Sequence, residues 1–196
     1  NVSIEIRPAW NEVGLLSVLN DVVQVPVAGG VQAQLGDAYG DERRRVVFQL
    51  RVPRLQTLGP TRIADVVVRY VAVGEQVAMH ELTVPVVARR PEYEPILDAE
   101  VTEEVTVLLS ARAHDEARHL ADAGRHDEAR AKLRAAAARL REVSRGSSRA
   151  EELELEAKLM EHRGDEIAHG RYGVMARKEM MFESRRRKQR RSRPGS

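Results

Sequence analysis

Histidines are the first residues whose spacing in this chain bears on chemistry. His114 and His119 are five residues apart, which separates them by about 140° on a helix, whereas the zinc motif HExxH requires a spacing of four. His162 and His169 are seven apart and would share a helix face, but Gly164 lies between them and no acidic ligand is fixed by the pattern. We therefore interpret all six histidines as ordinary surface or partly buried side chains, and we predict no metal site.

Paired carboxylates are the second feature of this kind. They occur as Glu103-Glu104, as Glu151-Glu152 and in the alternating run from Glu152 to Glu156. General acid–base catalysis needs carboxylates with separated pKa values in a cleft that excludes water. These pairs fall on the polar faces of predicted helices, so we interpret them as solvated side chains with partners four residues away.

Serines and glycines give no catalytic or phosphate-binding pattern. The chain has no Gly-x-Ser-x-Gly elbow. Gly29-Gly30 is followed by a predicted strand and lacks the Lys-Ser/Thr of a phosphate-binding loop, so it is interpreted as a hairpin turn. The sequence therefore predicts no catalytic residue and no cofactor, and we expect a protein that is not an enzyme.

Composition limits the class of protein. The chain has 196 residues, enough for one large domain or two small ones, and 42% of them are hydrophobic, enough for a core. It contains no Cys, which excludes disulfides and thiolate chemistry, and no apolar run approaches the roughly 20 residues of a membrane span. We expect a cytoplasmic location. Because the chain begins at Asn1, we also expect the natural amino terminus to lie upstream.

Up to about Arg90, apolar residues recur with a period of two, which is typical of strands with one buried face. Short connections such as Leu58-Gly59-Pro60 and Gly74-Glu75 favour antiparallel neighbours. Pro26, Pro53 and Pro85 are expected near strand ends or edges. This pattern predicts six or seven strands and an antiparallel β-sandwich over residues 1–92. The alternating runs are Val2, Ile4 and Ile6; Val23, Val25 and Val27; Val31, Ala33 and Leu35; Val46 to Val52; Val66, Val68 and Tyr70; and Leu82, Val84 and Val86.

After Pro95 the apolar spacing changes to three and four, which predicts amphipathic helices. The first should stop at Gly124, a second should run from about Asp127 to Val143, and a third should be interrupted by Gly164 and Gly170. The fold class is therefore α+β: an antiparallel β-sandwich followed by a C-terminal helical hairpin or small helical bundle over residues 93–183.

A basic tail over residues 184–196 follows the helices, and we expect it to be flexible or an extended helix end. In the alternative interpretation, the cations of this tail bind nucleic acid or an anionic membrane. No aromatic residue is interleaved among them for base stacking. The net charge of +2 falls by seven, to −5, when they are left out. They are Arg185, Arg186, Arg187, Lys188, Arg190, Arg191 and Arg193.

Two resemblances extend this interpretation. One helical hairpin is similar to a single tetratricopeptide repeat (TPR), on the small and large packing residues Ala117, Leu120, Gly124, Ala129, Leu133 and Ala136. Nearly the whole chain resembles the region that follows the von Willebrand factor type A (VWA) domain in many bacterial proteins. The residues that carry this second resemblance are Leu35-Gly36-Asp37, Asp41-Glu42, Val52-Pro53, Gly124 with Ala129, Arg171-Tyr172 and Arg177-Lys178.

The VWA resemblance implies an upstream domain that binds a divalent metal through an Asp-x-Ser-x-Ser loop and engages protein partners. This chain has no such loop, so metal binding is not carried over to any residue here. The leading hypothesis is a non-enzymatic interaction or accessory region that scaffolds or regulates that domain. The alternative is nucleic-acid or anionic-surface binding through the tail. The candidate packing or partner-contact residues are Trp10, Leu120, Leu133, Leu140 and Tyr172.

Overall fold

In the computed structural model, contacts divide the chain into a strand unit and a helical unit. The strand unit comprises Asn1–Pro95 with Arg191–Ser196, and the helical unit comprises Ile96–Arg190. The structure describes residues 1–39, 42–56, 59–73, 77–89, 97–189 and 191–192. The domain boundary expected at residues 92 and 93 lies outside these described residues.

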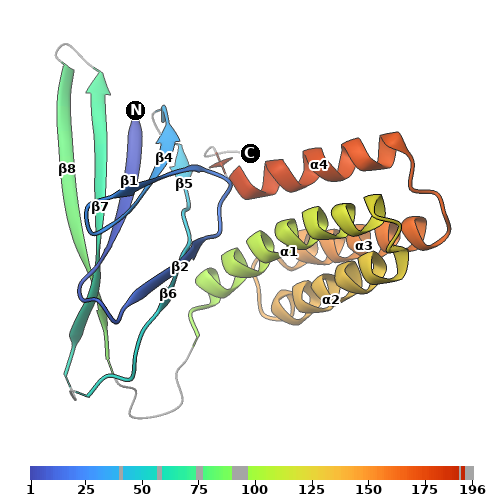
Figure 1. Ribbon diagram of the computed structural model, residues 1–196, viewed down its shortest axis with the longest axis horizontal. Coiled ribbons are helices and arrows are strands. Elements are labelled where there is room, and N and C mark those ends of the chain that lie inside the picture. Colours follow the sequence, from blue (N-terminus) through green and yellow to red (C-terminus); the bar gives the residue numbers. More distant parts are fainter. Residues whose placement is uncertain (40–41, 57–58, 74–76, 90–96, 190, 193–196) are drawn as a thin grey trace. The chain divides into compact units, whose positions relative to one another are not determined.

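Five antiparallel strands form the main sheet of the strand unit, in the order β3-β4-β1-β7-β8 (Figure 1). Two smaller pairs, β2 with β6 and β5 with β9, accompany it. The α+β class and the antiparallel pairing predicted from the sequence are confirmed. The strands are β1 (Val2–Pro8), β2 (Gly14–Val18), β3 (Val23–Val27), β4 (Gly30–Gly36), β5 (Arg43–Arg44), β6 (Phe48–Arg51), β7 (Thr61–Val73), β8 (Val77–Ala88) and β9 (Arg191–Ser192).

The register of the main sheet places mostly apolar residues on one face, whereas the other face carries polar residues together with the buried Val67. Ile4 is opposite Ala33 on β4 and Val68 on β7, whereas the next residue, Glu5, is opposite Gln32 and Val67. Because directly paired residues point to the same side of a sheet, the period of two in the sequence is preserved across strands. The buried apolar residues of this unit are Ile6, Val13, Val18, Leu19, Ala33, Leu35, Ile63, Ala64 and Val67.

Three prolines lie on edge strands or beyond a strand end, where the absence of a backbone N–H costs least. Pro26 is on β3 and Pro85 is on β8, the two edge strands of the main sheet, and Pro53 follows β6. Their predicted placement near ends or edges is confirmed. The turns expected at Leu58-Gly59-Pro60 and Gly74-Glu75 include residues outside the described ranges.

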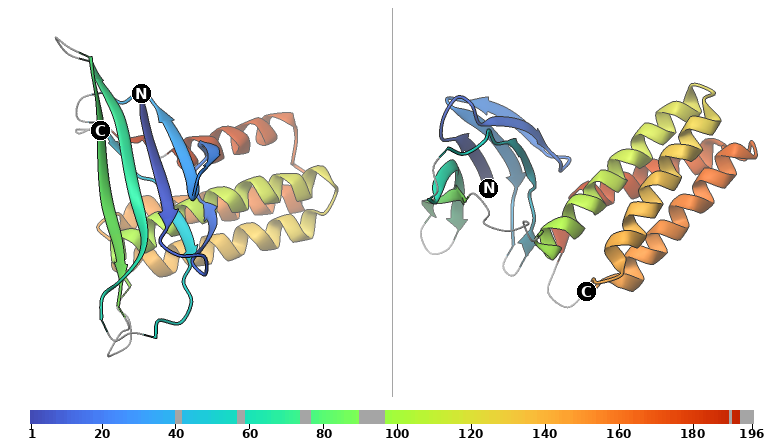
Figure 2. Two further views of the ribbon diagram at one scale, coloured as in Figure 1. Left: turned by 60° about the vertical axis from the view of Figure 1, so that its left-hand side comes forward. Right: turned by 90° about the horizontal axis from the view of Figure 1, so that it is seen from below.

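Over its described residues, 97–189, the helical unit contains four helices: α1 (Ala99–Asp122), α2 (His126–Ser144), α3 (Ala150–Ala168) and α4 (Val174–Gln189). Figures 1 and 2 show α2 between α1 and α3, with α4 packed along α1. Small side chains at the contacts, such as Ala117 and Ala129, let the helices approach closely, and both are fully buried. The core cluster also contains Leu133, Leu140, Leu153, Met160, Ile167 and Met180.

Local signals account for the ends of α1. The side chain of Asp98 accepts a hydrogen bond from the backbone N–H of Val101 (2.9 Å) and so caps the N-terminus. At the other end Gly124 adopts a φ of 75°, a conformation that glycine tolerates best. The predicted stop at Gly124 is therefore confirmed.

Three expectations differ from the structure. Gly164 does not interrupt the third helix: α3 continues through this glycine, which lies against Arg130 of α2. The runs around Val68 and Val84 belong to strands of 13 and 12 residues. The strand β2 was not anticipated, because its adjacent leucines hide the alternation.

Candidate interaction groove

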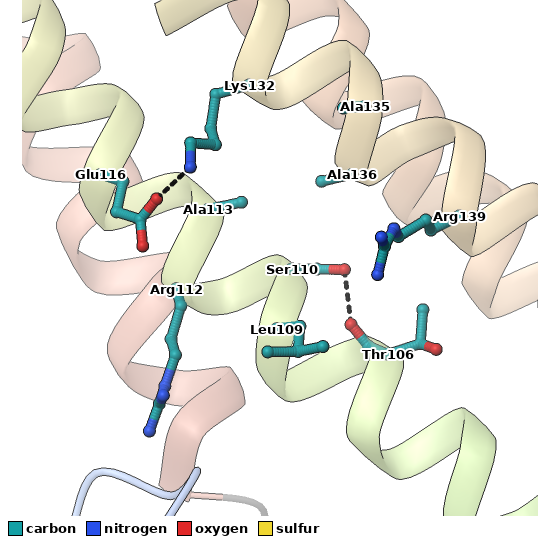
Figure 3. Close-up of a pocket in the computed structure, with 10 residues that line it drawn as sticks. All are labelled: Thr106, Leu109, Ser110, Arg112, Ala113, Glu116, Lys132, Ala135, Ala136 and Arg139. Atoms are coloured by element: carbon teal, nitrogen blue, oxygen red, sulfur yellow. Dashed lines mark hydrogen bonds and ion pairs between the residues drawn. The ribbon is translucent and has the colours of Figure 1, made fainter. Parts of the chain in front are cut away.

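A surface groove runs between α1 and α2 on the helical unit. One hollow of about 370 Å³ is lined by Ala113 and Ala136, which face each other from the two helices, and by Leu109 and Arg139 (Figure 3). Both alanines are buried, and their short side chains occupy little of the space between the two helices. The groove is thus a consequence of small residues on facing helices.

A second hollow of about 540 Å³ shares Thr106 and Arg139 with the first. It extends along the start of α1 and the end of α2, where Leu97 and Val143 contribute apolar surface. Leu97 is 75% exposed and Leu109 is 37% exposed, so both offer apolar area to another molecule. We call the two hollows together the α1–α2 groove.

Charges are distributed unevenly along the groove. Lys132 on α2 forms an ion pair with Glu116 on α1, which bridges the two helices. Arg139 is exposed, and within the described part of the chain it makes no ion pair or hydrogen bond. Figure 3 shows the side chain of Arg139 directed toward the space beside Ser110, whereas Arg112 extends away from it. Among the described residues, Arg139 is therefore the one cation of the groove without a carboxylate partner.

Residues with hydroxyl groups also line the groove. Ser110 donates a hydrogen bond to the backbone oxygen of Thr106 (2.8 Å), four residues earlier on α1. This bond uses the serine proton within the helix, and both residues line the groove. The arrangement of apolar side chains, an available cation and hydroxyls is suited to binding a polypeptide surface.

The predicted contact residues lie elsewhere. Leu133 and Leu140 are fully buried in the helical core, so they pack within the unit and have no area left for a partner. Leu120 is partly buried against the same core. The spacing of three and four that identified these leucines indicates the face turned inward, whereas the groove is formed by residues beside that face.

Tyr172 and Trp10 are partly buried and belong to different units. Tyr172 is partly buried, and its hydroxyl donates to Asp122 at the end of α1 (3.1 Å). Trp10 lies between β1 and β2, where its carbonyl oxygen accepts from the backbone N–H of Val13 (3.2 Å). Its indole Nε1 is buried and has no hydrogen-bond partner among the described residues.

The basic tail is only partly described. The backbone of Arg185, Arg186, Arg187 and Lys188 continues α4, which ends at Gln189. Arg191 belongs to β9, which pairs with β5. Arg190 and Arg193 lie outside the described residues.

The prediction that the acidic residues are solvated holds for Glu151 and Glu152, which are exposed, but it is wrong for the other pair. Glu103 and Glu104, expected to be solvated, are buried at 9% and 4% exposure, and Glu156 is also buried. Arg149, which precedes α3, compensates part of this charge. The pKa of Arg149 is raised, first by its hydrogen bond to Glu152 and also by the charges of Glu104 and Glu103.

The histidines do not gather at one place. His114 is buried within the helical unit, whereas His119 is exposed, which agrees with their predicted separation on the helix. His162 lies 3.6 Å from a carboxylate oxygen of Glu166, and His169 contacts the backbone oxygen of Asp165 (2.6 Å). Among the described residues, no group of three or more His, Asp or Glu side chains is arranged to hold a metal ion.

In comparisons with known proteins, no family model matches the chain, and no curated protein or solved structure shows significant similarity to it. None of the helices, over the residues described, combines the length and apolar character that crossing a bilayer requires.

Proposed function

We propose that this chain is a non-enzymatic protein-interaction region that scaffolds or regulates a VWA domain, and that the α1–α2 groove is its contact surface. In this proposal the strand unit acts as an accessory β-sandwich, and α1 with α2 acts as a repeat-like helical hairpin. The observation that carries the proposal is the groove itself. It is lined by the exposed Leu109 and by Arg139, which has no ion-pair partner among the described residues.

Three properties of the groove support a protein partner. It is open along two helices, so it accommodates an extended surface. Its apolar residues are separated by threonine hydroxyls and charged groups, a mixture typical of protein interfaces. Arginine is also among the residues that contribute most to binding when they are desolvated by a partner.

The first test is the coding sequence upstream of Asn1. A VWA domain there, identified by its Asp-x-Ser-x-Ser loop, would be purified and titrated into the present chain by calorimetry. We expect saturable binding that weakens about tenfold or more in Arg139→Glu and in Leu109→Glu, because each change removes a groove contact.

Matched controls lie on the exposed side of α3. Lys158→Glu reverses a charge and Leu155→Glu introduces the same acid at an exposed leucine, both outside the groove. These variants should bind as the unmodified chain does. An upstream sequence without such a domain, or binding that all four variants weaken equally, would contradict the proposal.

A further inference from the structure

Helix α4 has two sides with different surroundings. On one side Met180 and Ser184 are each 1% exposed, and the Ser184 hydroxyl donates to the backbone oxygen of Ala111 on α1 (2.9 Å). On the other side Met175 and Phe182 are 69% and 68% exposed. Packing on α1 therefore buries Met180 but leaves Met175 and Phe182 in solvent.

The exposed residues form a continuous stripe. Met175, Lys178 and Phe182 follow one another at spacings of three and four, so they lie along one face of the helix. Arg185 and Arg186 follow three and four residues beyond Phe182, where the backbone is still helical. Met181 is exposed beside the stripe. The helix face that exposes Met175 and Phe182, which we call the apolar stripe, is therefore followed directly by the basic run.

The charged residues at this end of the chain are all positive over a run of nine positions. Seven cations occur between Arg185 and Arg193 with no acid among them. Each cation near an anionic bilayer adds attraction that salt screens, while a partly inserted apolar face adds binding that salt does not screen. Here the basic run begins within α4, at Arg185, three residues after the exposed Phe182.

We propose that α4 and the basic run bind the surface of an anionic lipid bilayer, with Met175 and Phe182 inserted among the headgroups and the cations against lipid phosphates and carboxylates. This inference is independent of the groove on α1 and α2. A nucleic acid would use the cations but would leave Met175 without a role, and the basic run holds no aromatic residue for base stacking. The exposed methionine and phenylalanine therefore favour lipid.

The experiment is vesicle co-sedimentation of the full chain. Vesicles of phosphatidylcholine alone and of phosphatidylcholine with phosphatidylserine are compared at about 0.1 M and about 0.5 M salt. We expect binding only to the phosphatidylserine vesicles and a loss of most of it at the higher salt. Absence of binding to both kinds of vesicle would overturn the proposal.

Variants separate lipid from nucleic acid. The double variant M175S/F182S should bind phosphatidylserine vesicles about tenfold or more weakly while binding single-stranded RNA as the unmodified chain does. Leu155→Ser, at an exposed leucine on α3, is the matched control and should leave vesicle binding unchanged. Circular dichroism checks that the variants keep their helices.

Two results with these variants would overturn the lipid assignment. One is equal vesicle binding by M175S/F182S and the unmodified chain, because the apolar stripe would then contribute nothing. The other is tight RNA binding under salt conditions in which phosphatidylserine vesicles are not bound, which would assign the basic run to nucleic acid instead.

Discussion

The hydroxyl of Tyr172 donates a hydrogen bond to Oδ1 of Asp122 at 3.1 Å, which ties the connection between α3 and α4 to the end of α1. Asp122 also receives ion pairs from Arg177 of α4 (3.1 Å) and Arg118 of α1 (3.6 Å). One carboxylate therefore joins three segments of the helical unit.

This relationship predicts a stability loss at alkaline pH. Burial, followed by the bond to Asp122, raises the pKa of Tyr172 from 10.0 to about 12. Because the unfolded chain releases this proton first, the stabilisation is complete below pH 10 and disappears as the pH rises toward 12. Urea unfolding of Tyr172→Phe should show a smaller decline over this interval than the unmodified chain. An identical decline in both proteins would contradict the assignment.

The opposite pH dependence is expected for Glu161. Hydrogen bonds from Arg141 lower its pKa below the usual 4.5, and they join α2 to α3. The resulting stabilisation is present above pH 4.5 and is lost as the pH falls through the lowered value. Glu161→Gln should therefore be less stable than the unmodified chain at neutral pH, and the difference in Tm should shrink in acid. A difference that does not change with pH would count against this ion pair.

Gly164 provides a test of the α2–α3 contact. A Cβ atom there would lie 3.5 Å from Cγ of Arg130, an ordinary packing distance. Since the backbone is helical, Gly164→Ala should raise the free energy of unfolding by about 0.5–1 kcal/mol, measured by urea denaturation. Gly124→Ala is the contrasting control: it should destabilise the chain, because the φ of Gly124 is 75°. A destabilised Gly164→Ala variant would mean that the helices are closer than described.

Two adjacent glycines in the strand unit should respond differently. A Cβ atom on Gly30 would approach the backbone oxygen of Ile6 to 2.1 Å, so strands β1 and β4 would have to separate. We expect Gly30→Ala to cost about 3 kcal/mol or more. At Gly29, with a φ of 81° and open space around it, Ala should cost only about 1–2 kcal/mol. Urea unfolding measures both, and equal losses would contradict the β1–β4 register.

Periodicity and turn residues predict the elements of this fold well. Gly124 ends α1, Pro26 and Pro85 lie on edge strands, and Leu133 and Leu140 form the helical core, as spacing alone indicates. Each of these outcomes depends on local backbone geometry or on one amphipathic face. Such information is contained in a few neighbouring residues.

Tertiary contacts determine what the sequence pattern does not predict. Glu103 and Glu104 are charged, so spacing assigns them to solvent, but they are buried near the connection before α3, where the charge of Arg149 acts on both. The groove depends on Ala113 and Ala136 meeting across two helices, while Leu109 and Arg139 remain at its surface. Neither feature has a periodic signature, because each is created by residues distant in sequence.

Amide hydrogen exchange of the chain with and without the proposed VWA domain, if one is encoded upstream of Asn1, tests the central claim most directly. We predict that adding that domain slows exchange in residues 106–116 of α1 and 132–143 of α2, the segments that border the groove, and that Arg139→Glu abolishes this slowing. Slowing confined to other segments, or none at saturating concentrations of the domain, would contradict the assignment of the groove as the contact surface.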